Sequence, residues 1–147
     1  MSSPIASAKR NLFKKIMIEA HHSLSHNHRV EVLSQKISSL IDRRFPDAER
    51  IQCLDTGCGD MKIAETIQKQ CPKTIWSCID IYDLPEHLKA DACWSKYKKY
   101  DGKNVTFPDK SMDIVLLCDV LHHDQRNAFS IIQESARVGN VLIIKDH

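Results

Sequence analysis

Apolar residues in the first third of the chain recur every three or four positions, which is the spacing of one face of a helix. Residues 9–22 and residues 30–41 each carry such a stripe, and the second one ends before Pro46. Polar residues that disfavour a helix interior lie between the two stripes: Ser23, Ser25 and Asn27. We therefore expect two amphipathic helices, which together form an N-terminal helical cap over residues 1–47.

The pattern changes after residue 47 to short apolar runs that alternate with amphipathic stretches. The amphipathic stretches predict helices over residues 60–70 and 124–138, while residues 83–96 are ambiguous and fit a short helix. The apolar runs, together with one more polar segment, predict five strands: 51–56, 74–80, 96–100, 112–118 and 140–146. Strands that alternate with helices form βαβ units and a parallel sheet. The expected fold is α/β: a Rossmann-like, doubly wound, mostly parallel sheet over residues 48–147, with the two N-terminal helices packed on it.

The composition is that of an ordinary globular domain of 147 residues, with a net charge of only +2. So small a charge gives no support for binding to nucleic acid or to a membrane. No apolar run approaches the roughly 18 residues that cross a bilayer, and the N-terminus lacks the apolar stretch of a signal peptide. The six cysteines form no CxxC pair, and three of them lie in predicted strands. We therefore expect a cytoplasmic protein with reduced thiols.

Every predicted strand ends at or next to an aspartate: Asp55, Asp80, Asp101, Asp119 and Asp146. Ligands of open parallel sheets bind outside the carboxyl ends of the strands, at the point where strand order reverses. A solvent-exposed sheet edge also collects aspartates, so this pattern alone fits a functional edge and a solvated edge equally well. The residues next to these aspartates are needed to distinguish a functional edge from a solvated one.

The segment CLDTGCGDMK, residues 53–62, has the composition of a nucleotide-binding loop between a strand and a helix. Gly57 and Gly59 let the backbone approach a ligand closely, although a plain strand-to-helix turn would also use glycine. Asp80 ends the next strand, where a carboxylate is well placed to accept hydrogen bonds from both ribose hydroxyls of an adenosine group.

The spacing of the glycines distinguishes between two classes of cofactor. A dinucleotide loop of the form GxGxxG would need glycine at position 62, where the chain has Lys62, and this speaks against NAD and FAD. The loop D/E-x-G-x-G-x-G, which wraps the amino-acid end of S-adenosylmethionine, matches at Asp55 and at both glycines and departs only at Met61. The spacing therefore favours S-adenosylmethionine.

Four segments resemble the motifs of the class I S-adenosylmethionine-dependent methyltransferases: CLDTGCGD, CIDIYD, YDGKNVTFPDKSMDIVLLCDVLHH and ARVGNVLIIKDH. The resemblance runs from about Arg29 to His147, and the KDH ending is similar to that of one bacterial subgroup. The chain departs from the family pattern at Met61, Thr106 and Met112. None of these departures removes a polar contact to the cofactor.

The resemblance implies that S-adenosylmethionine is the cofactor and that ten residues contact it. The glycine loop would cradle its methionine part, Asp80 would hold the ribose hydroxyls, and Ile81 would lie against adenine. Asp101 would contact the adenine amino group, and the residues after the fourth strand would line the pocket near the methyl-bearing sulfur. The implied cofactor-binding residues are Asp55, Gly57, Cys58, Gly59, Asp80, Ile81, Asp101, Gly102, Cys118 and Asp119. The N-terminal helices would form part of a lid over this site.

The expected function is transfer of a methyl group from S-adenosylmethionine to an unidentified acceptor, for which a small molecule is favoured. The family usually continues past the fifth strand with a further helix and a hairpin, so the chain is interpreted as truncated, and such a fragment can be inactive. A second copy or a partner would cover the exposed edge of the fifth strand. The alternatives are a non-catalytic binding or regulatory module with the same fold and, with less support, an NAD-dependent oxidoreductase.

No catalytic residue and no metal site are assigned from the sequence. His122, His123, Asp146 and His147 lie near the edge where a general base would act, but a helix-start pair without catalytic duty is the favoured interpretation of the two adjacent histidines. The segment HHSLSHNH lacks the carboxylate of a zinc motif, and DVLHHD together with Asp146 is an equally weak candidate for a divalent ion.

Overall fold

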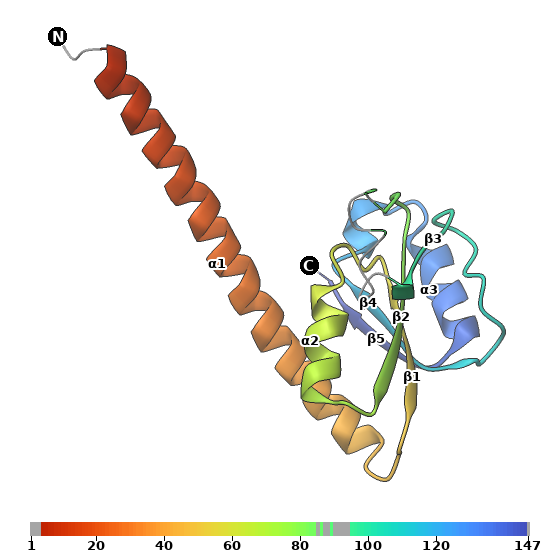
Figure 1. The fold of residues 1–147 in the computed structure, drawn as a ribbon. Helices are drawn as coiled ribbons and strands as arrows, with labels where there is room; N and C mark the ends of the chain where they lie inside the picture. Colours follow the sequence, from red (N-terminus) through yellow and green to blue (C-terminus); the bar gives the residue numbers. More distant parts are fainter. Residues whose placement is uncertain (1–3, 85, 87–88, 90–94, 147) are drawn as a thin grey trace.

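The computed structural model describes residues 4–84, 86, 89 and 95–146 of the chain. Its centre is a five-stranded sheet, parallel throughout, with the strand order β3-β2-β1-β4-β5 (Figure 1). The strands are β1 (Ile51–Thr56), β2 (Thr74–Asp80), β3 (Tyr97–Lys99), β4 (Met112–Cys118) and β5 (Gly139–Lys145). The α/β, doubly wound fold expected from the sequence is therefore confirmed.

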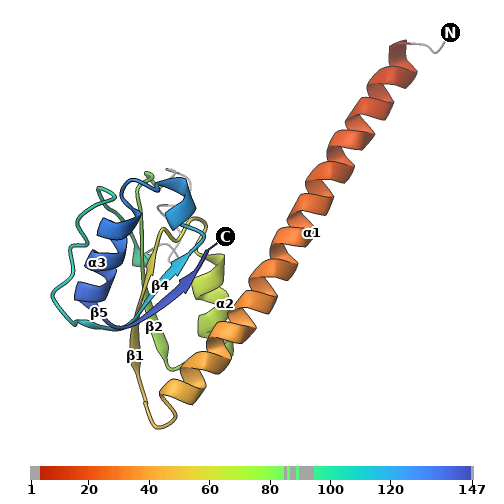
Figure 2. The same ribbon diagram turned by 180° about the vertical axis from the view of Figure 1, so that it is seen from behind.

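Helices cover both faces of this sheet (Figures 1 and 2). They are α1 (Pro4–Arg44), α2 (Lys62–Gln70), α3 (Ala128–Val138) and the short 3-10 helix η3 (Leu121–His123). The last part of α1 and α2 lie on one face, and α3 lies on the other. Strand order reverses between β1 and β4, so the ligand crevice is expected at the carboxyl ends of these two strands.

Two apolar clusters, one on each face, hold the helices on the sheet. Successive strand residues point to opposite faces, so Cys53 belongs to one cluster and Leu54 to the other. The cluster beneath α1 and α2 includes Ile37 and Ile41 of α1, which are 3% and 1% exposed. The cluster beneath α3 includes Val138, which is fully buried. The last part of α1 therefore contributes to the core of the sheet.

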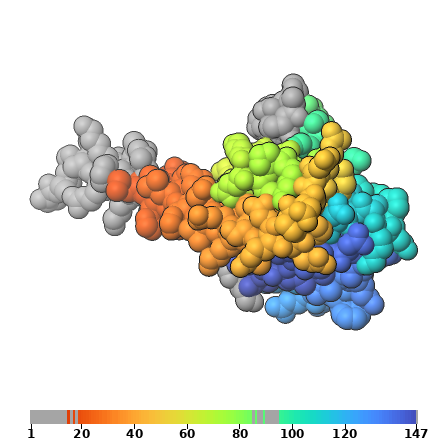
Figure 3. All heavy atoms as spheres, turned by 90° about the horizontal axis from the view of Figure 1, so that it is seen from below, coloured from red at the N-terminus to blue at the C-terminus, as the bar shows by residue number. Residues whose placement is uncertain are grey.

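The expectation of two N-terminal helices is wrong, because α1 is one continuous helix of 41 residues. Ser23, Ser25 and Asn27 are poor helix formers, but each costs only about 0.5 kcal/mol. Neither glycine nor proline separates the two apolar stripes, and helix propagation adds one hydrogen bond for every residue. As a result, the first part of α1 extends away from the sheet instead of packing on it (Figures 1 and 3).

The segment around β3 is described only in part. The third strand predicted at 96–100 is confirmed as the three residues of β3, which form one edge of the sheet. The ambiguous helix within residues 83–96 falls largely on positions outside the described residues, namely 85, 87–88 and 90–94. Among the residues that the structure describes, no helix combines the length and the apolar character needed to cross a membrane.

Candidate functional site

The loop between β1 and α2 carries three residues in the left-handed backbone region: Gly57 with φ 75°, Gly59 with φ 53° and Met61 with φ 59°. These are the three glycine positions of the loop pattern, and the backbone conformation explains why glycine suits them. Met61 adopts this conformation at a cost, while its side chain is only 1% exposed and packs in the core. A Cβ atom on Gly57 would lie 2.5 Å from Val120, whereas one on Gly59 would meet no atom within 4 Å. The second glycine therefore borders open space.

Asp80 fixes this loop against the end of β2. The Gly59 N–H donates to Asp80 Oδ2 at 2.8 Å, and the N–H of the residue after Asp80 donates to Oδ1 at 2.7 Å. The N–H groups of Gly57 and Cys58 both donate to the carbonyl oxygen of Ile79, at 2.8 and 3.1 Å. The two segments that were expected to share one cofactor are thus bonded to each other.

A cavity of about 290 Å³ opens at the carboxyl ends of β1 and β4, where strand order reverses. Six of the ten residues that were expected to contact the cofactor line it: Asp55, Gly57, Cys58, Gly59, Cys118 and Asp119. The switch point of the sheet, the glycine loop and the end of β4 therefore meet in one place.

Four residues of α1 form a further wall of this cavity: His26, Arg29, Val30 and Leu33. None of these four was expected as a site residue from the sequence, because the histidine-rich segment had been considered only as a metal site. A signal was available, since spacings of three and four positions place these residues on one helix face. The N-terminal region does cover part of the cavity, although as a single helix.

Asp55 is the most buried acid of the cavity, with 3% of its surface exposed. Burial raises the pKa of its carboxyl group to about 7, and the negative charges of Asp80 and Asp60 add to the rise. A positively charged ligand group beside Asp55 would favour its ionised form.

The two cysteines of the cavity are thiols at neutral pH. A hydrogen bond with Cys78, together with burial, raises the pKa of Cys58, and burial raises the pKa of Cys118 to about 11. The cysteines that the structure describes are all buried and free of disulfides, and a buried free thiol packs as a small apolar side chain. Neither cavity cysteine is a ready nucleophile.

The other residues expected at the cofactor lie at the ends of β2 and β3. Ile81 and Gly102 are neighbours, because a Cβ atom on Gly102 would lie 3.2 Å from Ile81 Cγ2. Ile81 is 48% exposed and so is accessible to a ligand. Asp101 accepts hydrogen bonds from the N–H groups of Asn104 and Lys103 in its own turn, and these bonds lower its pKa to about 2. The structure brings Ile81 and Gly102 together, and Oδ1 of Asp101 accepts both N–H groups of its turn, while Oδ2 accepts one hydrogen bond from Asn104 Nδ2. The contact of Asp101 with adenine stays a prediction.

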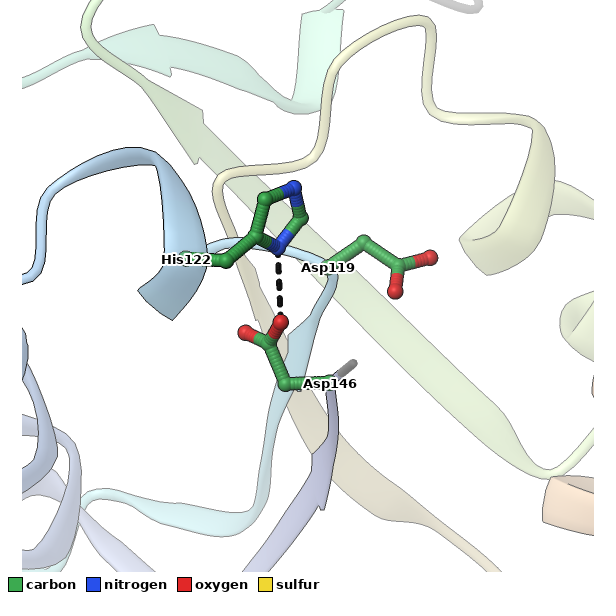
Figure 4. Close-up of side chains that lie close together, drawn as sticks. All are labelled: Asp119, His122 and Asp146. Atoms are coloured by element: carbon green, nitrogen blue, oxygen red, sulfur yellow. Dashed lines mark hydrogen bonds and ion pairs between the residues drawn. The ribbon is translucent and has the colours of Figure 1, made fainter.

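A second polar cluster lies at the ends of β4 and β5 (Figure 4). His122 Nδ1 lies 2.6 Å from Asp146 Oδ1, and the Leu121 N–H donates to Asp146 Oδ2 at 2.7 Å. Asp146 is thus held by the backbone and orients the imidazole ring, whose Nε2 points away from it (Figure 4). His147, another candidate base, lies outside the described residues.

Asp119, His122 and Asp146 offer ligand atoms within 4.8 Å of one another, which is close enough for one metal ion. The two carboxylate oxygens of Asp119, however, pair with the side chains of Arg29 and Lys145. These cations balance the negative charge and would repel a metal ion. The arrangement therefore favours a network of ion pairs over a metal centre.

A larger hollow of about 510 Å³ lies beside α2 and contains none of the ten expected site residues. Its lining comes mainly from α2 and β2, together with Lys96. Six of the ten residues expected to bind the cofactor line the smaller cavity instead.

The sequence and fold of the chain are similar to those of known methyltransferases. The family model of the methyltransferase domain matches residues 54–141, while no curated protein sequence matches the chain. Among solved structures, the chain is similar to a SAM-dependent methyltransferase from Methanosarcina mazei, with 24% identity, a TM-score of 0.55, and coverage of 65% of this chain and 52% of that one.

Two further solved structures show the same fold. One is a SAM-dependent methyltransferase from Aquifex aeolicus, with 17% identity, a TM-score of 0.54, and coverage of 74% of this chain and 63% of that one. The other is the cyclase SpnF, with 18% identity, a TM-score of 0.60, and coverage of 76% and 44%. The chain therefore spans between 44% and 63% of the length of these structures.

Proposed function

This chain belongs to the methyltransferase domain family, and on that premise we propose that it binds S-adenosylmethionine and transfers the methyl group to an acceptor. The observation that carries the proposal is the cavity at the carboxyl ends of β1 and β4. Six of the residues expected to contact the cofactor line it, at the switch point where open α/β sheets bind ligands.

The residues of the cavity fit the amino-acid end of this cofactor. The backbone of Gly59 borders open space, so a ligand can approach the loop where a side chain would otherwise stand. The buried Asp55 carboxyl group, with its pKa of about 7, would be stabilised in the ionised form by a positive group of the ligand. The ammonium and sulfonium groups of the cofactor are such groups.

The neighbouring ends of β2 and β3 fit the adenosine half. Each carboxylate oxygen of Asp80 accepts one backbone N–H, and each has a second lone pair for a ribose hydroxyl. The exposed Ile81 and the adjacent Gly102 would face the adenine ring. Asp101 Oδ1 accepts two N–H groups of its own turn, whereas Oδ2 accepts one, from Asn104 Nδ2, and keeps a lone pair for the adenine amino group.

When bound, the cofactor supplies a methyl group on a positively charged sulfur. The protein then has to align the acceptor with that methyl group and to exclude water from the reacting atoms. The neutral thiol of Cys118 lines the cavity without competing strongly as a nucleophile.

His122 is the residue that we place at the proton-transfer step. Asp146 would accept the Nδ1–H of His122, and this fixes the tautomer whose Nε2 carries the lone pair. Nε2 would take the proton from an acceptor hydroxyl as its oxygen attacks the methyl group, while the bond from that carbon to sulfur breaks and S-adenosylhomocysteine leaves. The paired geometry favours this role over the interpretation as a helix-start residue. The acceptor class proposed is a small molecule with a hydroxyl group.

The test is calorimetric titration of the purified chain with S-adenosylhomocysteine, with NAD as the control ligand and an Asp80→Ala variant. We expect micromolar binding of S-adenosylhomocysteine, no binding of NAD, and loss of affinity in the variant. Circular dichroism of both proteins separates loss of the site from loss of the fold. A folded chain that does not bind S-adenosylhomocysteine would overturn the proposal.

Methyl transfer is tested next, with labelled S-adenosylmethionine and a panel of small phenols and alcohols. We expect labelled product, and a His122→Gln variant that binds S-adenosylhomocysteine normally but turns over about 10²- to 10⁴-fold more slowly. Binding without any product would instead identify a non-catalytic module.

A further inference from the structure

We propose that Arg29 of α1 binds the carboxylate at the amino-acid end of the cofactor, which makes α1 part of the binding site; this inference rests on the proposed binding of S-adenosylmethionine. The charges of the cavity point to it. Among the described lining residues, three are acidic, namely Asp55, Asp60 and Asp119, and Arg29 is the single lysine or arginine. A ligand carboxylate therefore has one permanent cation to pair with.

The other basic residue of the lining is committed elsewhere. His26 Nε2 lies 3.4 Å from Asp60 Oδ2. A guanidinium group is moreover always charged and can bind both oxygens of a carboxylate at once, which an imidazole ring cannot.

Arg29 projects from a stretch of helix that the core holds in place. The next residue, Val30, is 7% exposed, and Ile37 further along α1 is 3% exposed within the cluster shared with α2. Because the guanidinium group is carried by an anchored helix, binding does not require a loop to become ordered.

Arg29 can leave its present partner, Asp119, with little loss of stability. Arg29 pairs with one oxygen of Asp119, while Lys145 of β5 pairs with the other. The Asp119 side chain is 17% exposed, so leaving it without any cation would be costly. Lys145 keeps that charge balanced when Arg29 turns to the ligand. Asp119 thus pairs with the arginine in this structure, and the ligand carboxylate would replace it.

The experiment compares two ligands that differ only at the amino-acid end. S-adenosylhomocysteine carries the carboxylate, and 5′-methylthioadenosine has the same adenosine and thioether without it. In an Arg29→Gln variant, we expect about 10- to 100-fold weaker binding of S-adenosylhomocysteine and unchanged binding of 5′-methylthioadenosine, as measured by calorimetry. Arg29→Lys keeps the charge without the two-point contact and should fall between the variant and the wild type.

An Arg43→Gln variant is the matched control, because Arg43 lies on the same helix and does not line the cavity. It should bind both ligands as the wild type does. Equal weakening of both ligands in Arg29→Gln, or no weakening of either, would overturn the assignment of Arg29. A folded wild-type chain that binds neither ligand would overturn the proposed function itself, so the two failures are distinguishable.

Discussion

At the scale of single residues, left-handed backbone conformations shape the loop between β1 and α2. Gly57 and Gly59 adopt them without cost from a side chain, and Gly57 also has no room for one beside Val120. Met61 adopts the same conformation with a full side chain, which it buries in the core. Its apolar contacts offset the backbone cost, so the departure from the glycine pattern is compatible with the loop.

Replacing Met61 by glycine tests this balance. The change removes a backbone cost of about 1–2 kcal/mol and loses the burial of a whole methionine side chain, with a cavity, at about 2–5 kcal/mol. We expect a net destabilisation of about 1–3 kcal/mol, measured by urea unfolding. Met61→Leu, which conserves the volume, should cost less than about 1.5 kcal/mol. A Met61→Gly variant more stable than the wild type would show that backbone strain dominates.

The buried carboxyl group of Asp55 predicts a pH dependence of stability. Its pKa in the folded chain, about 7, lies above the ordinary value of 3.8, so the folded state binds more protons than the unfolded state between these values. The contribution of Asp55 to stability is therefore full below about pH 4 and is lost as the pH rises through about 7. At pH 8 the ionised, buried carboxylate opposes folding.

Asp55→Asn removes this titration. The free energy of unfolding of the variant, relative to the wild type, should rise between pH 5 and pH 8 by an amount on the order of a few kcal/mol. Urea unfolding of both proteins at the two pH values measures it. A difference that stays constant with pH would contradict the raised pKa.

At the scale of elements, α1 has two parts with different environments. Its last part packs against α2 and the sheet through Ile37 and Ile41, and its first part extends away from them. Between these parts, Arg29 and its neighbours face the cavity. One continuous helix thus packs in the core with its last part, lines the cavity with its middle part and extends into solvent with its first part.

Two alanine substitutions distinguish the parts of α1. Ile37→Ala removes a side chain that is 3% exposed in the core and should destabilise the fold by about 2–5 kcal/mol. Met17→Ala changes a side chain that is 54% exposed, and its effect should stay within about 0.5 kcal/mol. Thermal and urea unfolding measure both. Similar effects of the two substitutions would mean that the whole of α1 packs alike.

At the scale of the whole molecule, the two edges of the sheet differ. The β3 edge carries the exposed Lys98 and Lys99, whose charges oppose pairing with another strand. The β5 edge is apolar, and Ile144 is 45% exposed there. The β5 edge is therefore the one that favours association with a second copy.

Ile144→Lys should lower self-association of the chain, since a charge at an edge strand opposes strand pairing. Sedimentation velocity over a range of concentrations measures the effect. Leu40→Lys is the control, because Leu40 is an equally exposed apolar side chain, at 46%, that lies on a helix and not on an edge strand. A wild-type chain that stays monomeric throughout, or an equal effect of the two substitutions, would contradict a role for this edge.

The sequence by itself determined the strands and the glycine loop. The residues of β1, β2 and β4 are those of the predicted runs 51–56, 74–80 and 112–118, because a buried parallel strand needs an uninterrupted apolar run. Strand ends and the adjoining loop then follow from chain order alone. This is why six of the expected residues lie at one cavity.

Only the tertiary structure decided how distant side chains meet. Arg29 of α1 pairs with Asp119 at the end of β4, and His122 pairs with Asp146 at the end of β5. Periodicity and residue type report which face of an element is apolar, and they carry no information on which polar partners packing brings within hydrogen-bond distance.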